Sequence, residues 1–204
     1  VSESTVVRFA AELGFEGYPQ LQKSLQDIIR NRLTTVQRME IIDEQLSGGV
    51  DVLHRVMSSD ADKIRRTQEE IDPKDFDTVI DSIIGARRIY ILGLRSSGVL
   101  AGFLSFYFNH IFEDVVNVGA AQGETFEQML RIGPNDVLIA ISFPRYSQRT
   151  LKAVHYAKKQ GACIIGITDS TSAPLAGMSN HVLLARSDMV SFVDSLVGPL
   201  SILN

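Results

Sequence analysis

The most informative stretch of the sequence is Val137-Leu138-Ile139-Ala140-Ile141-Ser142-Phe143-Pro144-Arg145-Tyr146-Ser147-Gln148-Arg149-Thr150. Its first five residues are apolar and mostly branched, with no polar alternation, which is typical of a strand buried on both faces. Pro144 excludes a simple continuation of strand or helix, and from Ser147 on the pattern becomes helical. The stretch therefore predicts a buried strand, a hydroxyl-rich turn and a helix start. Free backbone N–H groups and hydroxyls at such a place are able to hold an anion such as a phosphate ester.

Strands and helices alternate on both sides of this stretch, from Arg87 to the end of the chain. Strands are expected at 89–92, 115–118, 137–141, 163–168 and 181–185. Helices are expected at 99–112, 124–130, 147–160 and from Met189 onward. This alternation predicts right-handed βαβ units and a parallel sheet. Ligands of such sheets bind at the carboxyl ends of the strands.

Two loops at these strand ends carry hydroxyl side chains and one arginine each, and each loop precedes a helix. A phosphate held between the loops would accept hydrogen bonds from hydroxyls and helix N–H groups, and the arginines would add charge-assisted bonds. Helix capping explains one such loop on its own, but two loops at one sheet edge favour an anion site. The candidate ligand-binding residues in these loops are Arg95, Ser96, Ser97, Ser142, Arg145, Ser147 and Thr150.

Catalytic and cofactor signals are few. Glu124 follows a glycine-rich loop and is the one carboxylate expected to face the same pocket, either as a helix-start acid or as a ligand for a sugar hydroxyl. As a general base it would need an acid partner, and the sequence offers none. Gly93 and Gly98 do not match the dinucleotide fingerprint, and no P-loop is present. With a single cysteine, Cys163, no metal cluster is expected, and we predict no catalytic residue and no cofactor.

Composition is that of a soluble globular protein of one or two domains, with 204 residues, 45% of them hydrophobic and 22% charged. A net charge of −4 shows no global signature of nucleic-acid binding, although a small module is able to carry its own patch. The single cysteine and the lack of a signal peptide or a long apolar run favour the cytoplasm. The chain begins without Met and ends in an apolar run, so we expect part of a longer protein.

The first 18 residues predict a short helix that Ser2 caps and Gly14 stops. Apolar residues form one stripe of this helix. Residues 1–38 hold five basic and four acidic residues, so DNA binding here does not rest on bulk charge. An ordinary amphipathic helix is the alternative to a recognition helix, which would present its first turns to the major groove. The candidate DNA-binding residues are Ser2, Ser4, Thr5 and Arg8.

Two helices are expected between this segment and the sheet. Gly48-Gly49 is the clearest hinge signal. The first helix spans about 50–71, and the second runs from Pro73 to Gly85 after an Asp72 cap. The apolar residues expected to face inward are Val52, Leu53, Val56, Met57, Ile64 and Ile71 in the first helix, and Phe76, Val79, Ile80, Ile83 and Ile84 in the second.

Residues 86–204 resemble the sugar isomerase (SIS) domain, a flavodoxin-like sheet that binds phosphosugars. In that family a hydroxyl-containing loop follows the first strand, and Ser96 and Ser97 hold those positions here. The third strand of the family ends in Ser-x-Ser-Gly-x-Thr. Ser142 and Ser147 match its first and last positions, whereas Pro144 and Arg145 replace the second Ser and the Gly. The departure removes one phosphate hydroxyl and adds a guanidinium, which suggests a shifted ligand preference.

Residues 1–38 resemble the end of the helix-turn-helix domain of RpiR-family bacterial transcriptional regulators. The resemblance lies in the runs Val1-Ser2-Glu3-Ser4-Thr5-Val6-Val7-Arg8-Phe9 and Leu13-Gly14-Phe15-Glu16-Gly17-Tyr18. It implies a DNA-binding dimer or tetramer whose SIS domain senses a phosphorylated sugar or a related sugar-acid phosphate. The expected domains are the end of the helix-turn-helix domain at 1–46, linker helices at 47–85 and the SIS domain at 86–204.

The expected fold is therefore α/β: a flavodoxin-like parallel five-stranded sheet with flanking helices, preceded by an all-α helix-turn-helix segment and linker helices. The expected function is regulation of carbohydrate metabolism genes, as a repressor, with operator DNA and a phosphosugar as partners and no membrane. An aldose–ketose phosphate isomerase is the alternative, and it needs a base–acid pair that the sequence does not show. A third possibility, left open by Pro144, is a domain that has lost its ligand and only mediates assembly.

Overall fold

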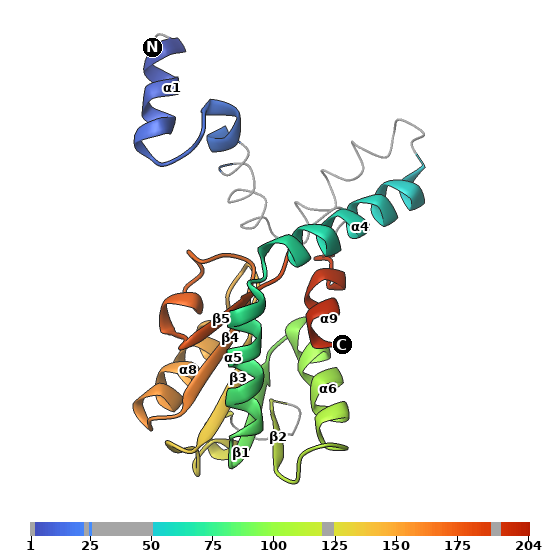
Figure 1. Ribbon diagram of the computed structural model, residues 1–204, viewed down its shortest axis with the longest axis vertical. Helices are drawn as coiled ribbons and strands as arrows, with labels where there is room; N and C mark the ends of the chain where they lie inside the picture. Colours follow the sequence, from blue (N-terminus) through green and yellow to red (C-terminus); the bar gives the residue numbers. More distant parts are fainter. Residues whose placement is uncertain (1–2, 23–24, 26–50, 120–124, 189–192) are drawn as a thin grey trace. The chain divides into compact units, whose positions relative to one another are not determined.

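The structure is a computed structural model that describes residues 3–22, 25, 51–119, 125–188 and 193–204 (Figure 1). The chain divides into two units, residues 1–50 and 51–204. Ser2, Gly48-Gly49 and Glu124, which carry three of the expectations above, lie outside the described residues. Among the described residues, no helix is long and apolar enough to span a membrane.

The second unit is built on a sheet of five parallel strands, in the order β2-β1-β3-β4-β5. The strands are β1 (Arg88–Gly93), β2 (Val115–Val118), β3 (Asp136–Ile141), β4 (Cys163–Thr168) and β5 (His181–Leu184). The predicted flavodoxin-like fold is thus confirmed. Gly93 at the end of β1 pairs with Ile141 at the end of β3, so both strands stop level at one edge. The strand order reverses between them, which is where open α/β sheets bind ligands.

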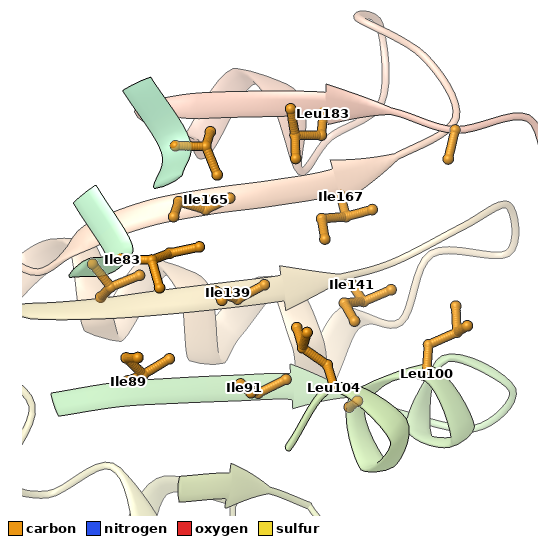
Figure 2. Close-up of a cluster of buried hydrophobic side chains, with 14 of the residues drawn as sticks. Ile83, Ile89, Ile91, Leu100, Leu104, Ile139, Ile141, Ile165, Ile167 and Leu183 are labelled. Carbon is orange, nitrogen blue, oxygen red and sulfur yellow. The ribbon is translucent and has the colours of Figure 1, made fainter. Parts of the chain in front are cut away.

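Helices cover both faces of the sheet, because successive strand residues point to opposite sides. One face packs Ile91, Ile139 and Ile165 against helices α5 (Pro73–Ile84), α6 (Ser97–Phe108) and α9 (Val197–Leu203). Figure 2 shows the strand side chains of this face with those of α5 and α6. The opposite face packs Tyr90 and Leu138 against helix α8 (Gln148–Lys159) and residues around the short helix α7 (Thr125–Gln128). A 3-10 turn, η1 (Ala176–Met178), precedes β5. The two apolar layers hold the strand ends, and therefore the loops after them, in fixed register.

Helix α4 (Val52–Glu70) differs from the prediction in which face it buries. Leu53 and Met57 were expected to face inward, yet both are about two-thirds exposed, and Val52 and Ile64 are exposed as well. The buried side chains of α4 are Lys63 and Thr67. The physical reason is that α4 packs on α9, and on the residues that precede α9, rather than on the sheet. Polar side chains satisfy the backbone there, as where Thr67 Oγ1 accepts a hydrogen bond from the Arg186 backbone N–H at 3.0 Å.

The last helix also begins later than predicted. A helix was expected from Met189, but the described residues 193–196 are not helical and α9 starts at Val197. Pro199 then lies in the first turn of α9, where a missing N–H costs no helical hydrogen bond. Helix α6 starts two residues earlier than expected, at Ser97.

In the first unit, α1 (Glu3–Glu12) matches the expected short helix, and Gly14 ends it with a left-handed φ of 84°. Ala10 is buried, whereas Phe9 and Leu13 are exposed. The described part of this unit therefore contains the complete helix α1 and, after its turn, a short helical stretch at residues 18–22.

Candidate functional site

A pocket lies where the loops after β1 and β3 meet. Its cavity volume is about 30 Å³, and it opens to solvent. The predicted residues that line it are Arg95, Ser96, Ser97, Ser142, Arg145, Ser147 and Thr150. Leu94, Ile141, Phe143 and Pro144 complete its walls. Of the candidate ligand-binding residues, only Glu124 cannot be placed, since it falls outside the described part of the chain.

The loop after β1 is short, with residues 94–96 joining the strand to α6. Gly93 makes this possible, because a Cβ at that position would lie 2.2 Å from the carbonyl oxygen of Ser97. The Ser96 side chain makes no capping hydrogen bond to the helix, although Ser96 occupies the cap position. Ser97 is buried to 5% exposure in the pocket wall. Helix capping therefore does not account for the hydroxyl of Ser96, and this hydroxyl is available to a ligand.

The loop after β3 is longer, with residues 142–147 preceding α8. The backbone of Ser142 is fixed at both ends of its peptide unit: its N–H donates to Ile167 O at 3.1 Å, and its carbonyl oxygen accepts from Thr168 Oγ1 at 2.8 Å. Ser147 caps α8, its hydroxyl accepting from the Thr150 N–H at 3.4 Å. The capping interpretation thus applies to Ser147, while Ser142 is held with its side chain in the pocket wall.

Thr150 has an unsatisfied hydroxyl in the pocket wall. Its side chain is fully buried, and Oγ1 has no hydrogen-bond partner among the described residues. A buried hydroxyl without a partner costs on the order of 1–3 kcal/mol, and native proteins rarely retain one without a reason. Because Thr150 lines the pocket, a ligand oxygen there would satisfy it.

Arg145 stands in a strained backbone conformation. Its φ is 69°, in the left-handed region that favours glycine. This explains the Gly of the Ser-x-Ser-Gly pattern, because the turn keeps the glycine geometry even with arginine in place. The guanidinium Nη2 donates to Asp194 Oδ2 at 2.6 Å. Asp194 was missed by sequence reasoning, since it lies 49 residues away on the connection between β5 and α9 and no motif marks it.

A second polar contact fixes the longer loop to the end of β4. The Tyr146 hydroxyl donates to Asp169 Oδ1 at 2.9 Å. Burial raises the pKa of Tyr146 well above its usual value, and the nearby Asp169 charge raises it further. Burial also raises the pKa of Asp169, against the opposing effect of the hydrogen bond from Tyr146. Neither residue was predicted, because the contact depends on the two strands being neighbours in the sheet.

The chemistry of the pocket is that of anion binding. Its described lining offers hydroxyls, two arginines and helix N-termini, with neither a carboxylate nor an imidazole. Such groups hold a phosphate ester but provide no base and acid for proton transfer. Across the described ranges, no cluster of three His, Cys, Asp or Glu side chains is arranged to hold a metal ion.

The candidate DNA-contacting residues belong to the other unit. Thr5 and Arg8 are exposed on α1. Ser4 lies in the first turn of α1, and Ser2 precedes the described residues. The structure thus places the exposed candidates, Thr5 and Arg8, within the first two turns of one helix.

A comparison with protein families matches residues 82–204 to the SIS domain. The chain is 28% identical to an uncharacterized HTH-type transcriptional regulator of Clostridium perfringens over 194 aligned residues. The alignment covers 92% of this chain and 66% of that protein. An HTH-type transcriptional regulator of Pseudomonas aeruginosa, HexR, is 26% identical over 90% of this chain and 62% of its own length. The chain thus spans slightly less than two thirds of these relatives.

Solved structures share the fold. The sugar isomerase domain of an RpiR transcription factor from Sphaerobacter thermophilus matches 76% of this chain and 87% of its own, with a TM-score of 0.72 and 23% identity. The NanR protein of Vibrio vulnificus, solved in complex with ManNAc-6P, matches 100% of this chain and 72% of its own, with a TM-score of 0.65 and 20% identity. A phosphoheptose isomerase from Francisella tularensis matches 75% and 92%, with a TM-score of 0.63 and 17% identity. At these identities the likeness concerns the fold alone.

Proposed function

The chain belongs to the SIS domain family, and from this premise we propose that it is part of a DNA-binding transcriptional regulator that senses a phosphorylated sugar. The phosphosugar binds in the pocket between the loops after β1 and β3. The regulated genes belong to carbohydrate metabolism, and the protein acts as a repressor. Two observations on relatives support this: the curated relatives are HTH-type regulators, and the NanR protein of the same fold was solved with ManNAc-6P.

The observation that carries the proposal is the buried, unpartnered hydroxyl of Thr150 in the wall of a pocket that also holds Ser97 and Ser142. A phosphate offers oxygens that accept hydrogen bonds from all three hydroxyls. Residues at the starts of α6 and α8 line the same pocket, and helix N-termini favour negative charge. Satisfying Thr150 only on binding adds affinity for an anion with several acceptor oxygens.

The arginines extend the ligand class to sugar-acid phosphates. Arg95 and Arg145 line the pocket from its two loops, and guanidinium groups pair with carboxylates as well as with phosphates. The ligand residues we propose are therefore the seven that line the pocket together with Glu124. The proposal includes no catalysis, because the described lining lacks an acid–base pair.

The DNA partner contacts α1. Arg8 is exposed there, and a short polar set with one arginine suits base-edge and phosphate contacts. We assign Ser2, Ser4, Thr5 and Arg8 to operator DNA, with the protein as a homodimer or tetramer in the cytoplasm. In the full-length protein, Arg8→Ala is expected to weaken binding to a duplex selected from a random pool, measured by fluorescence anisotropy. Glu12→Ala, on the same helix, is the control. Equal affinity of the Arg8→Ala variant and wild type would remove α1 as the DNA reader.

A thermal-shift screen tests the ligand. ManNAc-6P, glucose 6-phosphate and 6-phosphogluconate are compared with their unphosphorylated sugars and with inorganic phosphate. A ligand at a hundred times its Kd stabilises the folded state by about 2.7 kcal/mol, so a shift with the phosphorylated member of a pair and none with the sugar alone is expected. Stabilisation by the unphosphorylated sugars to the same extent would contradict the phosphate-based site.

The isomerase alternative has the fold in its favour, since the phosphoheptose isomerase shares it. It predicts turnover. Incubation of the protein with the ligand found in the screen, followed by separation of aldose and ketose phosphates, distinguishes the two. We expect no interconversion above the uncatalysed rate; sustained turnover that Ser97→Ala or Ser142→Ala abolishes would replace the regulator by an enzyme.

A further inference from the structure

The connection between β5 and α9 joins the pocket to helix α4. We call it the β5–α9 connection, described at residues 185–188 and 193–196. At the pocket, Asp194 accepts a hydrogen bond from Arg145 at 2.6 Å. The side chain of Asp194 is 13% exposed and that of Arg145 is 31% exposed, so the ion pair is partly exposed to solvent. A pair in such surroundings is screened less than one on the open surface.

The same connection is tied to α4. The residue after Asp194 is Ser195, and its hydroxyl donates to Asp60 Oδ1 on α4 at 2.7 Å. Asp60 also accepts from Lys63 Nζ, whose side chain is buried in α4. Ser187 Oγ donates to Ser195 O at 2.9 Å and closes the connection on itself.

A second attachment lies two turns further along α4. Thr67 accepts from the Arg186 N–H at 3.0 Å, and the Arg186 guanidinium pairs with Glu70. Gly198, at the start of α9, packs against Thr67 so closely that a Cβ there would lie 2.9 Å from its hydroxyl. The buried face of α4 is therefore made mostly of contacts to this connection and to α9, rather than of apolar contacts to the sheet.

We propose that Asp194 occupies Arg145 in the absence of ligand, that an anionic group of the ligand displaces Asp194 from Arg145, and that this exchange loosens the β5–α9 connection from α4. The inference rests on the proposed function of the pocket. Its physical basis is competition: a pocket anion that takes the Nη2 donor of Arg145 takes it from Asp194, and the negative charges of the anion and Asp194 repel each other. Ligand binding is then linked to the state of α4, the first element after the N-terminal unit in the chain.

A purely structural ion pair would only stiffen the loop after β3. The two roles differ in what happens when Asp194 is neutralised. If the pair is structural, Asp194→Asn leaves the anion affinity of the pocket unchanged or weakens it. If Asp194 competes with the ligand, the same change raises the affinity, because Arg145 is released to the pocket.

The test compares wild type with Asp194→Asn, Ser195→Ala and Asp188→Asn. Asp188 is exposed on the same connection and gives a chemically matched control. Hydrogen exchange of peptides covering α4 is measured first without any ligand. We expect Asp194→Asn to exchange roughly two- to five-fold faster than Asp188→Asn in α4, the range that loss of a partly exposed ion pair implies. Equal exchange in these two variants would overturn the coupling.

Binding of inorganic phosphate, by calorimetry, is the second measurement. We expect Asp194→Asn to bind phosphate roughly two- to five-fold tighter than wild type. Weaker or unchanged affinity would overturn the competition. Ser195→Ala keeps the Arg145–Asp194 pair and cuts the link to Asp60. It should bind phosphate like wild type while phosphate no longer changes exchange in α4, and a phosphate response like that of wild type would overturn the assigned route.

The ligand-free comparison separates this inference from the proposed function. If no phosphorylated sugar stabilises the protein, the proposed function fails, yet α4 exchange in Asp194→Asn still reports the coupling. If phosphosugars bind and α4 exchange does not respond to Asp194→Asn, the pocket stands and the coupling fails.

Discussion

The loops after β1 and β3 make the same connection, from a strand to a helix, with different structures. Each joins a buried strand to a helix start, and each holds an arginine in a left-handed conformation, Arg95 at φ 59° and Arg145 at φ 69°. The first loop is three residues long and depends on Gly93. The second is six residues long and is held by Asp194, on the connection between β5 and α9, and by Asp169, just after β4. The difference indicates that the first loop presents hydroxyls rigidly, whereas the second is the one able to respond to a ligand.

The largest expected effect tests the rigidity of the first loop. In Gly93→Ala, the new methyl group would meet the Ser97 carbonyl and Ala101, so the start of α6 must shift. We expect a loss of about 3 kcal/mol or more in the free energy of unfolding, at the upper end of overpacking effects. Gly98→Ala is the control, because its nearest contact is 3.4 Å. Chemical denaturation of both variants measures the difference, and a Gly93→Ala protein as stable as Gly98→Ala would contradict the close approach.

The next effect separates the two arginines. Glycine relieves left-handed strain at either position and raises the entropy of the unfolded chain, so the two terms roughly offset. Arg95→Gly is expected to unfold within about 0.5 kcal/mol of wild type, since no hydrogen bond or ion pair of its side chain is seen among the described residues. Arg145→Gly removes the ion pair with Asp194 and should be less stable by about 1–2 kcal/mol. Urea denaturation of both variants is the measurement, and equal stabilities would show that the ion pair does not hold the second loop.

A smaller effect distinguishes two buried threonines at the second loop. Thr168 Oγ1 donates to the Ser142 carbonyl, whereas Thr150 Oγ1 has no partner in the described ranges of the chain. Thr168→Val should therefore lower stability by about 1–2 kcal/mol, while Thr150→Val should leave it unchanged or raise it by up to about 1 kcal/mol. The ligand-free proteins are compared by differential scanning calorimetry. A Thr150→Val loss as large as that of Thr168→Val would mean that the Thr150 hydroxyl is already satisfied.

The smallest effect concerns pH. Burial raises the pKa of Asp169, so the folded protein binds this proton more tightly than the unfolded chain does. Binding of this proton stabilises the fold to its full extent at pH values below the pKa of Asp169 in the unfolded chain. The stabilisation is lost as the pH rises through the pKa of Asp169 in the folded protein. At a pH above the raised pKa, the ionised, partly buried Asp169 thus costs stability, and Asp169→Asn, which keeps an acceptor for Tyr146, should be the more stable protein. Urea titrations at pH 7 and pH 4 should show this advantage shrinking at pH 4; a constant advantage would contradict the raised pKa.

The sheet was predictable because apolar runs report burial directly. Each of the five runs became a parallel strand, and hydroxyls placed after two of them met in one pocket, as strand order requires. The resemblance of the chain to HTH-type transcriptional regulators is confirmed by the alignment with one such regulator along 92% of the chain. These inferences succeed since they depend on local pattern or on motif.

The rest depends on contacts between distant residues. An amphipathic pattern identifies the apolar face of a helix but not what covers it, so the exposed Leu53 and Met57 of α4 were assigned inward. Arg145 in place of glycine conceals the left-handed turn. Asp194 and Asp169 meet the second loop only after the strands have come together, and no spacing in the sequence marks them.

The central claim is that hydroxyls from both loops hold a phosphosugar. Isothermal titration of the best ligand from the thermal screen into Ser97→Ala/Ser142→Ala tests it most directly. The control is Ser170→Ala/Ser172→Ala, two serines after β4 that bond each other at 2.8 Å outside the pocket lining. Two lost hydrogen bonds to a charged group predict roughly a hundredfold weaker binding or more, with the control near wild type. Unchanged affinity in the Ser97/Ser142 double variant would contradict the site.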